Sequence, residues 1–133
     1  ASAVVITGGE PLMVNMEPLT SLLKQKGIEI FLETSGAYPL TGIWDWICLS
    51  PKKNMPPTGD IHQHADELKV IISDETDFEW AVENAGMVRD DCKLFLQPEW
   101  SNREKVLPPI IEFAKEHPSW NVSLQAHKYM RIP

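Results

Sequence analysis

The segment 7–11, with the sequence TGGEP, combines residue types that suit ligand binding, and it follows the apolar run 4–6. Its two glycines allow the backbone to approach a ligand closely or to adopt a positive φ, while Glu10 places a carboxylate at the turn. A ligand ammonium is the natural partner of that carboxylate. Glycine pairs also form plain strand-to-helix turns, and for an isolated pair that interpretation is favoured.

Four further polar clusters follow apolar runs along the chain: Glu33–Ser35, Ser50–Lys52, Gln97–Glu99 and Gln125–Lys128. In α/β folds, ligands bind at the carboxyl ends of the strands. We therefore expect these clusters to meet the TGGEP turn at one edge of a sheet.

The apolar patterns predict the elements that position these clusters. Strand composition recurs at 4–7, 28–32, 46–49, 68–72, 92–96 and 122–125. Helical spacing is found over 12–23, and capping-box patterns predict helices starting at Thr76 and Ser101. We expect 53–66 to be a loop, and Pro108 and Pro109 to kink or restart the last helix. The alternation predicts an α/β fold with a mainly parallel sheet.

Composition excludes several classes of function. The 133 residues fit one soluble globular domain, and no apolar run is long enough to span a bilayer. Lys and Arg number 12 against 19 Asp and Glu, which gives a net charge of −7 and argues against bulk nucleic-acid binding. Cys48 and Cys92 form no CxxC pair, and nothing resembles a signal peptide, so we expect free thiols in a cytoplasmic protein.

A second candidate site is the His62-Gln63-His64 segment, which could offer two nitrogens to a metal ion with help from Asp60 or Asp66. The alternative is a solvated polar loop that follows two prolines. The composition of the segment favours this loop over a metal site.

The TGGEP turn after a hydrophobic strand resembles the motif with which radical S-adenosylmethionine enzymes hold the methionine ammonium of their cofactor. ETSG at 33–36, SPK at 50–52, LQP at 96–98 and QAHKY at 125–129, with the terminal IP, extend the likeness. Over essentially all 133 residues the chain is similar to the 7-carboxy-7-deazaguanine synthase family. The resemblance implies a partial (βα) barrel of the radical S-adenosylmethionine type.

The implied reaction is the ring contraction of 6-carboxy-5,6,7,8-tetrahydropterin to 7-carboxy-7-deazaguanine with loss of ammonia. This carbon–nitrogen lyase reaction supplies queuosine, a tRNA modification, and other 7-deazapurines. The resemblance also implies S-adenosylmethionine, a [4Fe-4S] cluster, Mg²⁺, an external electron donor and a homodimer.

Matched residue by residue, the resemblance assigns the S-adenosylmethionine contacts to Gly9, Glu10, Ser50, Pro51, Lys52, Gln97, Pro98 and Glu99. Thr7 and the terminal carboxylate of Pro133 would contact the pterin, and Gln125, His127 and Lys128 would orient that tail. The matched positions include neither a catalytic residue nor a metal ligand.

One departure from the family pattern is the missing CxxxCxxC cluster motif. Cys48 and Cys92 lie in apolar strand contexts, where cysteine is ordinarily a small buried side chain. We therefore expect residues 1–133 to be a single domain, the C-terminal portion of the enzyme, and to be inactive alone.

Two other functions stay open at this point. Another radical S-adenosylmethionine enzyme, such as an activator of a glycyl radical enzyme, would share GGEP but has no reason to end in this tail. A non-catalytic α/β fragment would bind a partner or nothing.

Overall fold

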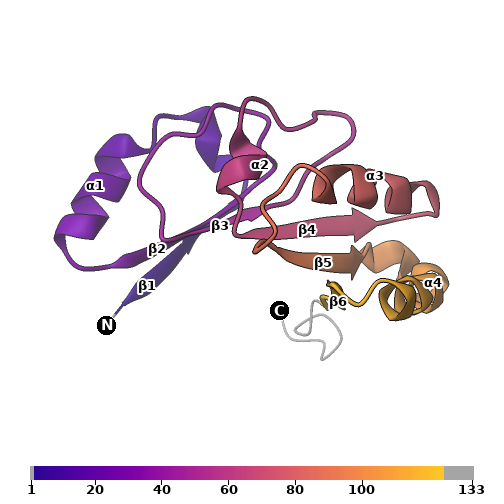
Figure 1. Cartoon of the computed structure of the whole chain (residues 1–133). Helices are drawn as coiled ribbons and strands as arrows, with labels where there is room; N and C mark the ends of the chain where they lie inside the picture. Colours follow the sequence, from indigo (N-terminus) through magenta and orange to yellow (C-terminus); the bar gives the residue numbers. More distant parts are fainter. Residues whose placement is uncertain (1, 125–133) are drawn as a thin grey trace.

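The computed structural model describes residues 2–124, and its elements alternate between strands and helices along the chain (Figure 1). The strands are β1 (Ala3–Ile6), β2 (Glu29–Thr34), β3 (Trp46–Leu49), β4 (Glu67–Ile72), β5 (Lys93–Pro98) and β6 (Trp120–Val122). The α-helices are α1 (Glu17–Gln25), α2 (Ile61–His64), α3 (Thr76–Ala85) and α4 (Arg103–Glu116). Short 3-10 turns occupy Pro11–Met13 and Trp100–Asn102.

The six strands form one sheet in the order β1-β2-β3-β4-β5-β6, and every neighbouring pair is parallel. The predicted α/β fold with a parallel sheet is thus confirmed. Within residues 2–124, β1 and β6 each pair with one strand only, so the sheet is open. Parallel pairing places the carboxyl ends of all the strands at one edge.

The two faces of the sheet differ because side chains alternate along each strand. In β2 and β4 every second side chain is buried, among them Ile30, Leu32, Leu68 and Val70, whereas the residues between them are only half-buried or exposed. The helices α1, α2 and α3 lie on one side of the sheet (Figure 1). The main core joins Leu49, Leu68 and Val70 to side chains of α2, α3 and α4.

Three local predictions are wrong. The expected loop 53–66 contains the short helix α2, which buries Ile61 under the sheet. Helix α4 continues through Pro108 and Pro109, so the predicted restart of the helix is wrong, whereas a kink there stays a prediction. Neither capping box forms, because α3 and α4 are preceded by Glu75 and Asn102 and neither residue makes a side-chain capping hydrogen bond. The Glu99 carboxylate accepts the Asn102 amide at the 3-10 turn before α4. Among the described residues, no helix has both the length and the apolar character needed to cross a membrane.

Asp77, in the first turn of α3, holds the loop that precedes the helix, whereas the helix start lacks the side-chain cap that was expected of Thr76. The Asp77 carboxylate accepts the Ser73 and Asp74 amides at 2.7 and 3.2 Å and pairs with the Lys53 ammonium. Burial opposes ionisation of Asp77, but the Lys53 hydrogen bond and the two amides together lower its pKa.

Asp77→Asn is expected to lower the free energy of unfolding by about 1–3 kcal/mol at pH 7, because the charge-assisted bonds are lost. A lowered pKa in the folded state stabilises above the unfolded pKa, and this stabilisation disappears as the pH falls through the folded value. The difference between Asp77→Asn and the parent should therefore shrink in acid. Urea titrations between pH 7 and pH 3 measure it, with the exposed Asp90→Asn as the control. A difference that stays constant with pH would contradict the argument.

Candidate functional site

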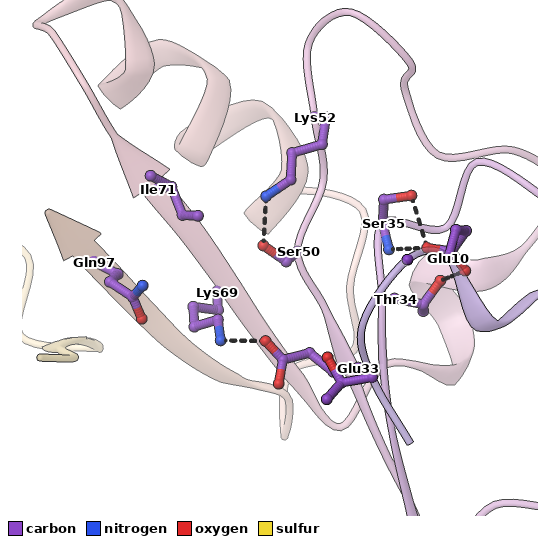
Figure 2. A pocket seen from close by; sticks show the side chains of 11 residues that line it. Glu10, Glu33, Thr34, Ser35, Ser50, Lys52, Lys69, Ile71 and Gln97 are labelled. Atoms are coloured by element: carbon purple, nitrogen blue, oxygen red, sulfur yellow. Dashed lines mark hydrogen bonds and ion pairs between the residues drawn. The ribbon is translucent and has the colours of Figure 1, made fainter. Parts of the chain in front are cut away.

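A cleft of about 260 Å³ lies at the carboxyl ends of the strands, where the sequence predicts the ligand (Figure 2). It is lined by Thr7, Gly9, Glu10, Glu33, Thr34, Ser35, Ser50, Lys52, Lys69, Ile71 and Gln97. A second cavity of about 300 Å³ shares Lys52 and Ile71 with it. The two adjoining cavities can accept an extended ligand.

The glycine turn leaves open space beside its backbone. Gly8 and Gly9 both adopt the left-handed region, with φ of 78° and 48°. A Cβ added at either position would meet nothing within 4 Å, so close packing against this chain does not explain the glycines. Their conformation exposes backbone at the rim of the cleft, where a ligand can approach.

Glu10 ties the turn to the end of β2. Its Oε2 accepts the Leu12 amide at 2.9 Å and the Thr34 hydroxyl at 2.7 Å. Its Oε1 accepts the amide and hydroxyl of Ser35 at 2.9 and 3.0 Å. Burial opposes ionisation, but these hydrogen bonds, led by that from Thr34, lower the pKa of Glu10. Four accepted bonds fill the lone-pair positions of a carboxylate, so Glu10 holds the loop in shape whether or not a ligand binds.

The SPK segment supplies a lysine to the cleft. The Ser50 amide donates to the Thr34 carbonyl at 2.8 Å, which fixes the start of the segment beside β2. The Lys52 ammonium donates to the Ser50 hydroxyl at 3.2 Å, and Figure 2 shows it pointing back toward that residue. Although Lys52 is exposed as a whole, burial of its ammonium end, followed by the nearby charge of Lys69, lowers its pKa. A bound anion would relieve both effects.

Gln97 lies in β5 at the opposite wall of the cleft and is only 4% exposed. Its Oε1 accepts a hydrogen bond from the Ser123 hydroxyl at 3.4 Å. Within residues 2–124 the Gln97 amide nitrogen has no acceptor. An almost fully buried amide nitrogen of this kind is suited to hydrogen-bond a ligand.

The other expected contacts lie beside the cleft. Pro51 borders the second cavity, where its carbonyl accepts the Trp80 indole at 3.3 Å. Pro98 ends β5, and the Glu99 side chain turns toward the Asn102 amide at 3.1 Å. Pro133 and the expected tail residues Gln125, His127 and Lys128 lie outside the described residues.

Lys69 and Ile71 line the cleft but were not singled out as site residues from the sequence. Both come from the interior of β4, not from a polar cluster after a strand. The alternating pattern of β4 could have predicted the position of Lys69. This residue falls between Leu68 and Val70, so its side chain must point away from the face on which they are buried. Glu33 was expected at this edge, but its role as partner of Lys69 was not.

The two cysteines are both buried and free, as expected. Burial, with smaller contributions from neighbouring charges, raises the pKa of Cys48 to about 12 and that of Cys92 to about 11. Such thiols resist the deprotonation that metal ligation requires.

The two histidines of α2, His62 and His64, have different partners and do not share a metal site among the described residues. His62 is buried and its Nε2 lies 2.8 Å from Oδ1 of Asn84, so the expected solvated loop is wrong for this residue. His64 Nε2 faces Asp60 at 3.2 Å on the surface. In the part of the chain that the structure covers, no three His, Cys, Asp or Glu side chains are grouped to hold a metal ion.

Comparison with known proteins gives consistent matches. A 7-carboxy-7-deazaguanine synthase of Flavobacterium psychrophilum is 50% identical over 133 residues, covering 100% of this chain and 63% of that protein. A 7-carboxy-7-deazaguanine synthase of Prochlorococcus marinus is 36% identical, and the match covers 99% of this chain and 68% of that protein. The crystal structure of QueE from Escherichia coli matches with a TM-score of 0.81 at 32% identity, over 94% of this chain and 57% of that one.

No protein-family model matches the chain. The chain spans less than two thirds of the length of two such synthases, 63% of the Flavobacterium psychrophilum protein and 62% of a Synechocystis protein. The structural match confirms the expectation of a fold of the radical S-adenosylmethionine type.

Proposed function

Because the chain belongs to the 7-carboxy-7-deazaguanine synthase family, we propose that it forms the cofactor- and substrate-binding edge of such an enzyme. In this proposal residues 1–133 are one structural unit, the C-terminal portion of the enzyme. The reaction is the ring contraction of 6-carboxy-5,6,7,8-tetrahydropterin to 7-carboxy-7-deazaguanine with loss of ammonia. The observation that carries the proposal is the convergence of Thr7, Gly9, Lys52 and Gln97 on one cleft.

The chemistry of the cleft fits S-adenosylmethionine. The open backbone at Gly9 can approach the methionine group, and the Lys52 ammonium and the Gln97 amide can donate to its oxygens. Glu10, held by its own chain, adds a negative charge near the methionine ammonium. Ser50, Pro51, Pro98 and Glu99 complete the proposed cofactor edge, and Thr7 and Pro133 are the proposed pterin contacts. When bound, the cofactor supplies the radical chemistry, while these residues bind and orient it.

The chain does not offer ligands for the iron–sulfur cluster. A [4Fe-4S] cluster needs several cysteine thiolates, whereas Cys48 and Cys92 are buried thiols with raised pKa values. We therefore assign the cluster, and the Mg²⁺ expected in the family, to residues outside these 133. A homodimer, an external electron donor, a cytoplasmic location and a place in queuosine synthesis complete the proposal, supported by family membership.

Lys52→Met in the full-length protein is expected to weaken S-adenosylmethionine binding about 10- to 100-fold, because a charge-assisted donor is lost. Isothermal titration of the anaerobically reconstituted protein measures binding, and conversion of 6-carboxytetrahydropterin measures the reaction. The matched control is Lys26→Met, which changes an exposed lysine just after α1. If the parent protein binds S-adenosylmethionine but leaves the pterin unchanged, the ring-contraction assignment fails. If Lys52→Met binds normally, the cofactor edge is misplaced.

A further inference from the structure

Lys69 is a half-buried cation in the floor of the cleft. Its side chain is 17% exposed, and its ammonium lies 2.6 Å from Oε1 of Glu33. The two residues belong to β4 and β2, so the ion pair passes across β3, which runs between those strands. Figure 2 shows Lys69 between Gln97 and Glu33, with Ser50 and Lys52 above them in that view. Lys69 therefore contributes to the electrostatics of the whole site.

Several hydrogen-bond donors in the cleft have no acceptor among residues 2–124. An ammonium carries three donors, of which Lys69 uses one for Glu33 and Lys52 uses one for Ser50. The Gln97 amide nitrogen is also unused. Donors without a protein partner at the wall of a cleft are available to a ligand, so this arrangement favours an incoming acceptor.

The charges in the cleft favour a monoanion. Glu33 neutralises Lys69, and the charge of Glu10 is spread over four internal hydrogen bonds. Lys52 has no carboxylate partner among the described residues, and the charge of Lys69 repels it. A single negative charge with two oxygens could bridge the two lysines and balance the charge of Lys52. A dianionic phosphate would leave a surplus negative charge beside Glu33.

We propose that Lys69 and Lys52 together bind a ligand carboxylate, with the Gln97 amide as a third donor. This inference rests on the proposed function, in which both small molecules carry one carboxylate: the methionine group of S-adenosylmethionine and the 6-carboxylate of the pterin. The chemistry is shared, so the experiment must separate the two sources. Lys69 has a second effect, because its ion pair also holds the Glu33 carboxylate in place.

The test compares ligands with and without the carboxylate. S-adenosylmethionine is paired with its decarboxylated form, and 6-carboxytetrahydropterin with 6-methyltetrahydropterin. Each is titrated calorimetrically into the full-length reconstituted protein and into Lys69→Met. We expect Lys69→Met to weaken one carboxylate-bearing ligand about 10- to 100-fold, with less than about a threefold change for its partner. The identity of that ligand names the source of the carboxylate.

Four further variants complete the test. Lys93→Met, at the exposed start of β5, controls for loss of a lysine. Lys69→Gln keeps a polar side chain, and Lys69→Met combined with Glu33→Gln leaves no unpaired acid, so at least one variant should fold. If Lys69 only positions Glu33, then Glu33→Gln alone should match the double variant, and both ligands of a pair should weaken equally.

The outcomes separate the two proposals. Equal weakening within both ligand pairs, or no weakening at all, overturns the carboxylate site while leaving the proposed function intact. If the parent protein binds neither S-adenosylmethionine nor the pterin, the proposed function fails, and the carboxylate site fails with it. Selective loss of one carboxylate-bearing ligand supports both.

Discussion

Gly36→Ala is expected to lower the free energy of unfolding by about 2–5 kcal/mol, the sum of left-handed backbone strain and core overpacking. Gly36 has φ of +74°, and a Cβ there would lie 2.7 Å from Cδ1 of Leu49. It would also lie 3.1 Å from Cγ2 of Ile61 and 3.2 Å from Cβ of Pro57. Leu49 and Ile61 are fully buried, so neither can move aside cheaply. Chemical denaturation of the protein measures the loss.

Gly59→Ala separates the two causes of that loss. Gly59 has φ of +61°, but a Cβ there would meet nothing within 4 Å. It should therefore show the backbone strain alone, about 1–2 kcal/mol. Equal losses at the two positions would show that the core around Leu49 adapts to the added methyl group, contrary to the packing argument.

Glu10→Ala is expected to lower the free energy of unfolding by about 2–4 kcal/mol, because the donors from Leu12, Thr34 and Ser35 lose their acceptor. Thr34 is only 3% exposed, so water does not readily replace the lost bond. Glu10→Gln keeps one oxygen and should lose roughly half as much. Urea denaturation at pH 7 orders the variants, and titration with S-adenosylmethionine follows the effect on binding.

Glu29→Ala is the matched control, since Glu29 is an exposed carboxylate at the other end of β2. It should leave stability and binding nearly unchanged. If Glu10→Ala is as stable as Glu29→Ala and yet binds S-adenosylmethionine poorly, Glu10 acts on the ligand alone. That result would contradict its role in holding the turn to β2.

The sequence predicted the architecture because hydrophobic periodicity carries it. Apolar runs such as Trp46–Leu49 can be satisfied only as buried strands, and alternation with helices leaves few topologies. The main lining residues Gly9, Ser50, Lys52 and Gln97 were predicted because a parallel sheet gathers its strand ends.

The remaining features depend on tertiary contacts that no local pattern encodes. The Lys69–Glu33 pair joins residues 36 positions apart. Helix α2 is stabilised by burial of Ile61, not by propensity, because four residues are too few to form a helix alone. Neither predicted capping box forms, although two carboxylates bind amides nearby: Asp77 accepts the Ser73 and Asp74 amides, and Glu99 accepts the Asn102 amide. None of these is an amide that the pattern assigned to the hydroxyl of Thr76 or Ser101.

The strand order has a consequence for synthesis on the ribosome. Chain order and spatial order coincide, so each strand that emerges can add to the exposed edge of the one before it, and none has to be inserted between earlier strands. The loop at Glu10 acquires its hydrogen bonds once Thr34 and Ser35, 24 and 25 residues later, have emerged. The two lysines follow, and Gln97 comes last. The lining of the cleft is thus assembled stepwise along the chain and is complete only after β5 has joined the sheet.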